Sequence, residues 1–216
     1  MHGVEVFLDT EATPELIAAQ KPDVVVVATG SHWDTSGYSV HRPDRDGIPG
    51  ADSPIVTDIA TATRRALADP RSLGDRVLIF DESGAFMPLG LADVLLSAGV
   101  EVEIATSHLF VGEDNLKTME LPHVLPPLYA KGLKLAPQTM IDSIDGNDVA
   151  LQFVWGGPAR VERVDTVVLS QMRVPNEELY FALKGTGPDV RRAGDAVTPR
   201  SLYAVVYEGE VVGREI

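Results

Sequence analysis

The pattern of apolar and polar positions is clearest in residues 76–106. Residues 77–80 form a continuous apolar run, typical of a parallel strand that is buried on both faces. Residues 81–85 (DESGA) have the composition of a turn, and four apolar residues then recur at helical spacing: Leu91, Val94, Leu95 and Ala98. Gly99 ends this helix, and residues 100–105 form a second strand. The pattern predicts a βαβ unit.

The turn of this βαβ unit is the first candidate binding site. Free N–H groups and the positive end of a helix dipole favour an anionic ligand at this edge of a parallel sheet. The candidate residues are Asp81, Ser83, Gly84 and Ala85 in the turn, with Thr106 after the second strand. A dinucleotide-binding turn has glycine where Asp81 and Ser83 stand, and an acid where Thr106 stands. Two interpretations stay open: a degenerate nucleotide site, and an empty structural unit.

Further apolar runs extend the predicted sheet. Residues 23–28 (DVVVVA) and 165–170 (DTVVLS) are continuous apolar strands, expected to be buried in a parallel sheet. Residues 4–8 alternate and indicate another strand. Short runs separated by turn residues predict a small antiparallel meander over residues 140–144, 149–155 and 159–164. The predicted fold class is therefore α/β.

The expected helices lie between these strands. Three are expected at residues 14–20, 57–68 and 177–183. Prolines interrupt residues 115–130, where we expect a helix in pieces. Thr198 is the expected cap of the final helix, with Pro199 at its first position.

Composition and charge exclude several classes of function. The net charge of −14 opposes binding to nucleic acid or to an anionic membrane surface. The chain has no cysteine, which excludes disulfides and cysteine-ligated iron–sulfur clusters within it. Its five histidines lack metal-ligand spacing, so no metal site is expected. No apolar run reaches the ~20 residues of a membrane span, and the N-terminus has no targeting signal, so we expect a cytoplasmic protein.

Several motifs together resemble a known family. They are ATG at residues 28–30, IPGAD at 48–52, the βαβ unit, DTVVLSQMRVPNEEL at 165–179 and GDAVTPR at 194–200. Their order resembles the C-terminal FAD/NAD(P)-binding region of Old Yellow Enzyme-type NADH:flavin oxidoreductases. This group includes trimethylamine and histamine dehydrogenases and 2,4-dienoyl-CoA reductase. The resemblance covers nearly the whole chain.

The resemblance implies two nested Rossmann-like domains of the glutathione-reductase type. Residues 1–56 and 165–216 would form a partial FAD-type outer domain, and residues 57–164 an inner NAD(P)- or ADP-type domain. Residues implied near FAD are Thr29, Gly30, Gly194, Asp195 and Thr198. ADP or NAD(P)H would belong to the turn of the βαβ unit. In this family a barrel domain carries FMN and a [4Fe–4S] cluster.

The sequence also departs from the family pattern. The barrel is absent, and so is the first βαβ unit of the outer domain with its glycine-rich fingerprint. We expect an excised fragment of a longer enzyme, although a partner chain that supplies the rest and a free-standing protein are alternatives.

Two functions are compatible with these features. The first is the nucleotide-binding portion or subunit of a flavin-dependent oxidoreductase or amine dehydrogenase, with adenine nucleotide or flavin as ligand and no catalytic residue of its own. The second is a non-catalytic scaffold or interaction module. It would dock on a partner chain, or form a homo-oligomer through the sheet surface exposed around residues 24–27.

Overall fold

The computed structural model describes residues 3–216, which divide into two compact units. The first unit combines the chain up to His32 with Arg173–Ile216, and the second is Trp33–Met172. Residues 33–56 and 165–172, which the sequence analysis grouped with the outer domain, lie in the second unit. The reason is that β3 and β10, defined below, belong to its central sheet.

The second unit is built on a five-stranded parallel sheet. Its strand order is β3-β10-β4-β5-β6. The strands are β3 (Val56–Asp58), β10 (Thr166–Ser170), β4 (Arg76–Asp81), β5 (Glu101–Ala105) and β6 (Lys134–Ala136). The α/β class and the parallel arrangement predicted from the continuous apolar runs are confirmed.

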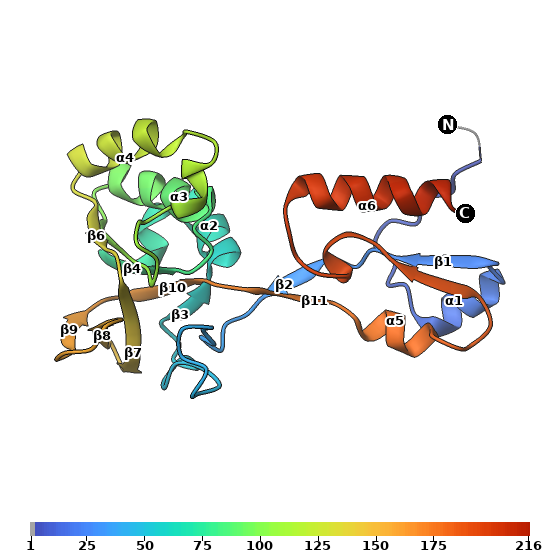
Figure 1. Ribbon diagram of the computed structural model, residues 1–216, viewed down its shortest axis with the longest axis horizontal. Coiled ribbons are helices and arrows are strands. Elements are labelled where there is room, and N and C mark those ends of the chain that lie inside the picture. The colour runs from blue at the N-terminus through green and yellow to red at the C-terminus, as the bar shows by residue number, and fades with distance from the viewer. Residues whose placement is uncertain (1–2) are drawn as a thin grey trace. The chain divides into compact units, whose positions relative to one another are not determined.

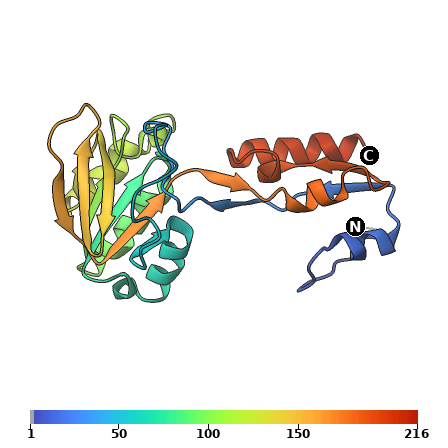
Figure 2. The same ribbon diagram turned by 90° about the horizontal axis from the view of Figure 1, so that it is seen from below.

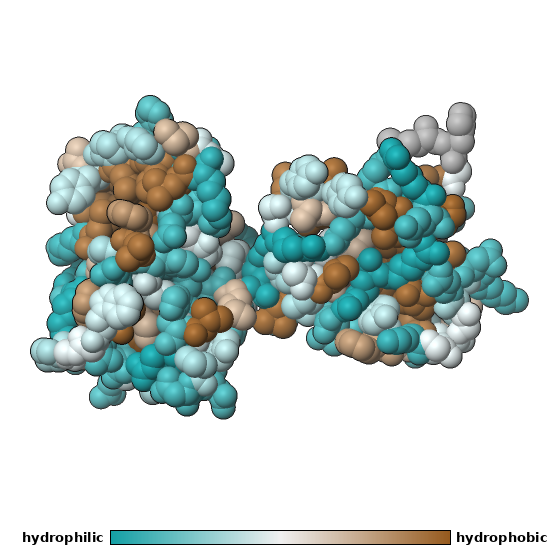
Figure 3. Space-filling model, in the orientation of Figure 1, coloured by the Kyte–Doolittle hydropathy of each residue, from teal (hydrophilic) through white to brown (hydrophobic). Residues whose placement is uncertain are grey.

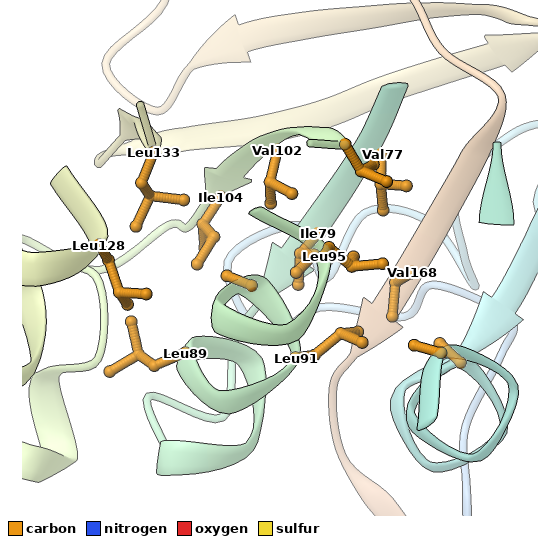
Figure 4. Packing of buried hydrophobic residues seen from close by; sticks show 14 of the residues in the cluster. Val77, Ile79, Leu89, Leu91, Leu95, Val102, Ile104, Leu128, Leu133 and Val168 are labelled. Carbon is orange, nitrogen blue, oxygen red and sulfur yellow. The ribbon is translucent and has the colours of Figure 1, made fainter. Parts of the chain in front are cut away.

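Helices cover one face of this sheet (Figure 1). They are α2 (Ile59–Ala68), α3 (Phe86–Ser97) and α4 (Leu121–Ala130), with the 3-10 turns η1 (Pro70–Leu73) and η2 (Glu113–Leu116). Val77 and Ile79 of β4 point to this side, where they pack with Leu91 and Leu95 of α3 (Figure 4). Leu91 and Leu95, which the sequence analysis placed on the apolar face of this helix, therefore lie on its buried face.

The antiparallel meander covers the other face. It consists of β7 (Thr139–Asp145), β8 (Asp148–Phe153) and β9 (Arg160–Arg163), as predicted (Figure 2). Leu78 and Phe80 of β4 point to this side and share a core with Ile141 and Leu151. The loop before β3 contributes Ile48 to the same core.

The first unit is smaller. Strand β1 (Val24–Val27) pairs in parallel with β12 (Asp189–Arg192), and β2 (Ser31–Trp33) pairs with β11 (Arg173–Pro175). Its helices are α1 (Pro14–Gln20), α5 (Glu178–Leu183) and α6 (Leu202–Arg214), with the 3-10 turn η3 (Gly194–Ala196). Figure 1 shows α6 on one side of the β1–β12 pair, with α1 and α5 on the other.

Two predictions about strands were wrong, and one about a helix was correct only in part. Residues 4–8 form no strand, because no strand of the described chain pairs with them. Strand β1 is not buried on both faces, since Val26 is 38% exposed. The helix expected in pieces over residues 115–130 is found as η2 and α4, with a break at residues 117–120. Pro126 and Pro127 do not interrupt α4, because packing of Leu121 and Leu128 in the core outweighs two lost backbone hydrogen bonds.

The start of the last helix also differs from the prediction. Ser201, not Thr198, caps α6, and its hydroxyl accepts from the Ala204 N–H at 3.4 Å. Thr198 instead donates its N–H to the Gly194 carbonyl at 3.4 Å, and the Arg200 N–H goes to Asp195 Oδ1 at 3.3 Å. These turn bonds hold the segment out of the helix until Ser201.

A substitution of Gly50 tests how closely the loop before β3 packs on the meander. Gly50 has a φ of +85°, and a Cβ there would lie 2.0 Å from the Ile144 carbonyl oxygen. We expect Gly50→Ala to lower the free energy of unfolding by at least about 2 kcal/mol, because strain and overlap with backbone add. Urea unfolding followed by circular dichroism measures this change.

Gly132→Ala is the matched control for Gly50→Ala. Gly132 has a similar φ of +95°, but no atom lies within 4 Å of its would-be Cβ. The control should lose only about 1 kcal/mol, from backbone strain alone. Equal losses in the two variants would refute the close packing at Gly50.

Candidate functional site

The turn between β4 and α3 is organised by Asp81, the last residue of β4. Its Oδ1 accepts from the backbone N–H groups of Ser83 and Gly84, at 2.9 and 3.0 Å, and from the Ser83 hydroxyl at 2.7 Å. Gly84 has the predicted positive φ, at +62°. The Asp81 side chain is thus directed into the turn and is fully buried.

The remaining N–H groups of the turn also have acceptors within the protein. Those of Glu82 and Ser83 lie 2.9 and 3.1 Å from the Ser170 carbonyl oxygen, at the end of the neighbouring strand β10. The Ala85 N–H donates to Ser83 Oγ at 3.2 Å. A dinucleotide-binding turn presents such groups to a pyrophosphate. In this chain residues 82–85 do not fit a pyrophosphate, because their N–H groups are already bonded within the protein. No side chain among the described residues caps the first N–H groups of α3.

Burial raises the pKa of the Asp81 carboxyl, and its hydrogen bonds to Ser83 and Gly84 oppose that rise only in part. Its Oδ2 is buried without a hydrogen-bond partner in the described part of the chain. The carboxyl therefore has one oxygen that accepts hydrogen bonds and one buried oxygen that accepts none from the described residues.

Glu82 joins three segments next to this turn. Its carboxylate accepts from Ser39 Oγ at 2.6 Å, from Ser107 Oγ at 3.1 Å and from Gln171 Nε2 at 3.1 Å. These partners come from the loop before β3, the end of β5 and the end of β10. Thr106 itself is buried and accepts from the His108 N–H at 3.2 Å. The Glu82 carboxylate therefore lies beside the end of β5. A dinucleotide-binding site has an acid at the position of Thr106, which directly follows this strand.

A cavity of about 720 Å³ opens beside Ser107. Its walls come from the loop before β3, the segment after β5 and the meander, and include His41, Arg42, Ser107, His108, Glu113, Gln152, Phe153 and Trp155. Phe153 and Trp155 are 45% and 77% exposed. This size lies in the usual range of small-molecule sites.

Two histidines lie on one wall of the cavity. The His108 ring contacts His41 edge-on, with centroids 6.1 Å apart. Its Nε2 lies 3.1 Å from the Glu82 carbonyl oxygen, and its Nδ1 lies 3.6 Å from Glu113 Oε2. These contacts connect the cavity wall to the β4–α3 turn.

The sequence analysis missed the residues of this cavity. They lie on segments about 100 residues apart that only the fold brings together, as the hydrogen bond from Arg42 to Asp142 shows. The exposed aromatic residues at the end of β8 were the available signal. Among residues 3–216, no group of three side chains is arranged to hold a metal ion.

The first unit brings together the other predicted residues. Thr29-Gly30 follow β1 and Gly194-Asp195 follow β12, and these two strands pair along their whole length. Asn176 holds the first segment: it accepts from Thr29 Oγ1 through its carbonyl at 2.6 Å and donates Nδ2 to the Thr29 carbonyl at 3.0 Å. No atom lies within 4 Å of a Cβ built on Gly30, so a ligand has room to approach its backbone.

Asp195 is already part of a polar network. Its Oδ2 accepts from Ser31 Oγ at 3.1 Å and forms an ion pair with Arg173. The neighbouring Gly194 N–H donates to Glu208 Oε2 at 2.9 Å. The carboxylate of Asp195 keeps acceptor capacity for a sugar hydroxyl, because a carboxylate offers about four lone pairs.

The fold is a Rossmann-like α/β arrangement of the kind found in flavoprotein oxidoreductases. Among solved structures, 6-hydroxypseudooxynicotine amine oxidase of Pseudomonas geniculata N1 is 28% identical, with a TM-score of 0.86 over 99% of this chain. Histamine dehydrogenase of Rhizobium sp. 4-9 shares the fold at 24% identity, with a TM-score of 0.88 over the whole chain.

Sequence comparison gives the same group of oxidoreductases. Dimethylamine dehydrogenase of Hyphomicrobium sp. is 26% identical over 89% of this chain. The predicted resemblance is therefore confirmed. No protein-family profile matches the chain.

The chain spans about a third of the length of these relatives: 29% of dimethylamine dehydrogenase, 32% of the amine oxidase and 34% of histamine dehydrogenase. The match lies in their C-terminal part. No helix within residues 3–216 has the length and apolar character that crossing a membrane requires.

The buried carboxyl of Asp81 predicts a specific dependence of stability on pH. Because its folded-state pKa is raised above the usual 3.8, the unfolded chain ionises first as pH rises. The wild-type protein then loses the stability that the protonated carboxyl contributed. Asp81→Asn does not titrate, so its stability relative to wild type should increase as pH rises above about 4, until the folded-state carboxyl has ionised as well.

Urea unfolding of both proteins across this pH range measures the effect. All other carboxylates are common to the two chains and cancel in the difference between their free energies of unfolding. A difference that is constant with pH, or that falls as pH rises, would show that Asp81 is not a carboxyl disfavoured by burial.

Proposed function

We propose that this chain is the nucleotide-binding C-terminal portion, or a separate subunit, of a flavin-dependent NADH oxidoreductase or amine dehydrogenase. The supporting observation is the cavity at the carboxyl edge of the five-stranded sheet, where nucleotides bind in folds of this type. The redox chemistry would belong to FMN and a [4Fe–4S] cluster in a barrel domain outside this chain. The chain itself would bind and position nucleotides.

The second unit would hold an adenine nucleotide. Phe153 and Trp155 offer exposed aromatic faces for stacking with a base, while Ser107 and Glu113 offer oxygen atoms for a sugar. Ser83 and Gly84 would not contribute, because their N–H groups are already bonded to Asp81. ADP would fit this arrangement better than NAD(P)H, since its diphosphate can end in solvent, whereas that of a dinucleotide must continue over the turn to the second nucleoside.

The first unit would contribute part of an FAD site. Thr29 and Gly30 end one strand and Gly194 and Asp195 end its neighbour, so both pairs lie at one edge of the sheet. Asp195 would accept from hydroxyl groups of the flavin's sugar chain. Thr198 would lie in a loop near this site and would not present a helix N-terminus to FAD, because α6 is capped by Ser201.

A second candidate function is an interaction module that docks on a partner chain or on another copy. Helix α6 has no buried residue, and Leu202, Tyr203 and Val206 on it are each more than 60% exposed. Figure 3 shows further apolar side chains on the surface over α3 and α4. Exposed apolar surface of this kind favours association.

Binding of ADP tests the nucleotide site. We expect the purified chain to bind ADP in titration calorimetry, and Phe153→Ala to weaken binding about tenfold, because one base-stacking contact is removed. Phe181→Ala is the matched control: Phe181 is 58% exposed and belongs to the first unit. Failure to bind any nucleotide, together with tight self-association in sedimentation, would favour the interaction module instead.

Binding of FAD tests the other site. Asp195→Ala should weaken FAD at least about tenfold, since a charged acceptor is lost, and should leave ADP affinity unchanged. Asp189→Ala is a suitable control, because Asp189 also pairs with an arginine, at 2.8 Å from Arg191. Equal effects of Asp195→Ala on FAD and ADP would contradict two separate sites.

A further inference from the structure

The β4–α3 turn stands in the place of a phosphate cradle, but a carboxylate of the chain itself occupies it. Asp81 Oδ1 lies within 3.0 Å of both the Ser83 and the Gly84 backbone nitrogen. Two N–H groups that converge on one anionic oxygen are the arrangement by which such turns bind a phosphate oxygen. The position of the ligand oxygen is thus taken by a residue of the strand.

The second oxygen of Asp81 shows that this arrangement is not a fully satisfied cap. Oδ2 is buried and lacks a hydrogen-bond partner among residues 3–216. A carboxylate placed only to stabilise the turn would be expected to have donors for both oxygens, because a buried oxygen without a donor is costly. Oδ2 is instead a buried oxygen to which no group among residues 3–216 donates a hydrogen bond.

The space over the turn is also restricted. The Asp114 N–H donates to the Gly84 carbonyl at 3.0 Å, and Asn115 Nδ2 donates to the same oxygen at 3.1 Å. A Cβ built on Gly84 would lie 3.2 Å from the Asp114 nitrogen. These contacts from the 3-10 turn η2 fix the backbone of Gly84, and with it the N–H group that donates to Asp81.

From these observations we infer that Asp81 is a specificity-determining residue that excludes pyrophosphate from the turn. The inference rests on the proposed nucleotide site and narrows its ligand class. The cavity recognises the base and sugar of an adenine nucleotide, and the β4–α3 turn contributes nothing to the binding of its phosphates. An intact dinucleotide such as NADH gains no affinity from its pyrophosphate here.

Titration calorimetry of the 216-residue chain with adenosine, AMP, ADP and inorganic pyrophosphate tests this inference. The wild-type chain should bind adenosine, AMP and ADP within about threefold of one another, and pyrophosphate should not bind. Asp81→Ala frees the Gly84 N–H, leaves the Ser83 N–H with only its 3.1 Å bond to the Ser170 carbonyl, and removes the carboxyl group. It should raise the affinity for ADP relative to adenosine by at least about tenfold, and pyrophosphate should then bind.

Two further variants separate this effect from a general loss of stability. Asp58→Ala removes another aspartate that accepts a backbone N–H, from Thr61 at 2.8 Å, and should leave the ratio of ADP to adenosine affinity unchanged. Asp81→Asn keeps an acceptor for the two N–H groups and removes the titratable carboxyl. It should raise the ratio less than Asp81→Ala, and it provides the test if the alanine variant does not fold.

The outcomes distinguish this inference from the proposed function. Wild-type binding of ADP more than about tenfold tighter than adenosine, or an unchanged ratio in both Asp81 variants, would overturn the inference and leave the nucleotide site in place. Absence of binding by every adenine compound would overturn the nucleotide site. In that case a gain of pyrophosphate binding in Asp81→Ala would still support the role of Asp81, and no gain would refute it.

Discussion

The burial of strand β4 on all sides is the constraint on which the second unit depends. Its backbone is bonded to β10 on one edge and to β5 on the other, and its side chains alternate between two separate cores. Such a strand must be apolar at every position that it buries. Asp81 is the exception, because it ends the strand and turns its carboxylate onto the N–H groups that follow. The same residue thus terminates the strand and shapes the site.

The sequence was sufficient to assign the elements that have a local or strongly periodic pattern of apolar residues. Val77 to Phe80 could be assigned from continuous apolar character, and α3 from the spacing of Leu91 and Leu95, because both patterns persist in the fold. The errors lie where distant contacts decide. Residues 4–8 alternate like a strand but have no neighbour to pair with, and Thr198 looks like a helix cap but is held in a turn by Gly194.

The candidate site could be located from the sequence only in part. Asp81, Ser83 and Gly84 were placed in the correct turn, since turn composition and strand ends are local properties. The direction of the Asp81 carboxylate was not accessible, because it depends on the φ of Gly84 and on the buried environment. The cavity was missed altogether: its walls come from three segments whose proximity follows from the sheet order and from the packing of the meander.

A shared fold does not imply that a ligand is held in the same way. In a dinucleotide-binding turn the N–H groups stay unpaired until a phosphate arrives, so that the ligand contributes to the stability of the turn. Here Asp81 and Ser170 accept those hydrogen bonds in the protein alone. The turn is therefore complete without a nucleotide. A turn of this kind keeps its fold without a bound nucleotide.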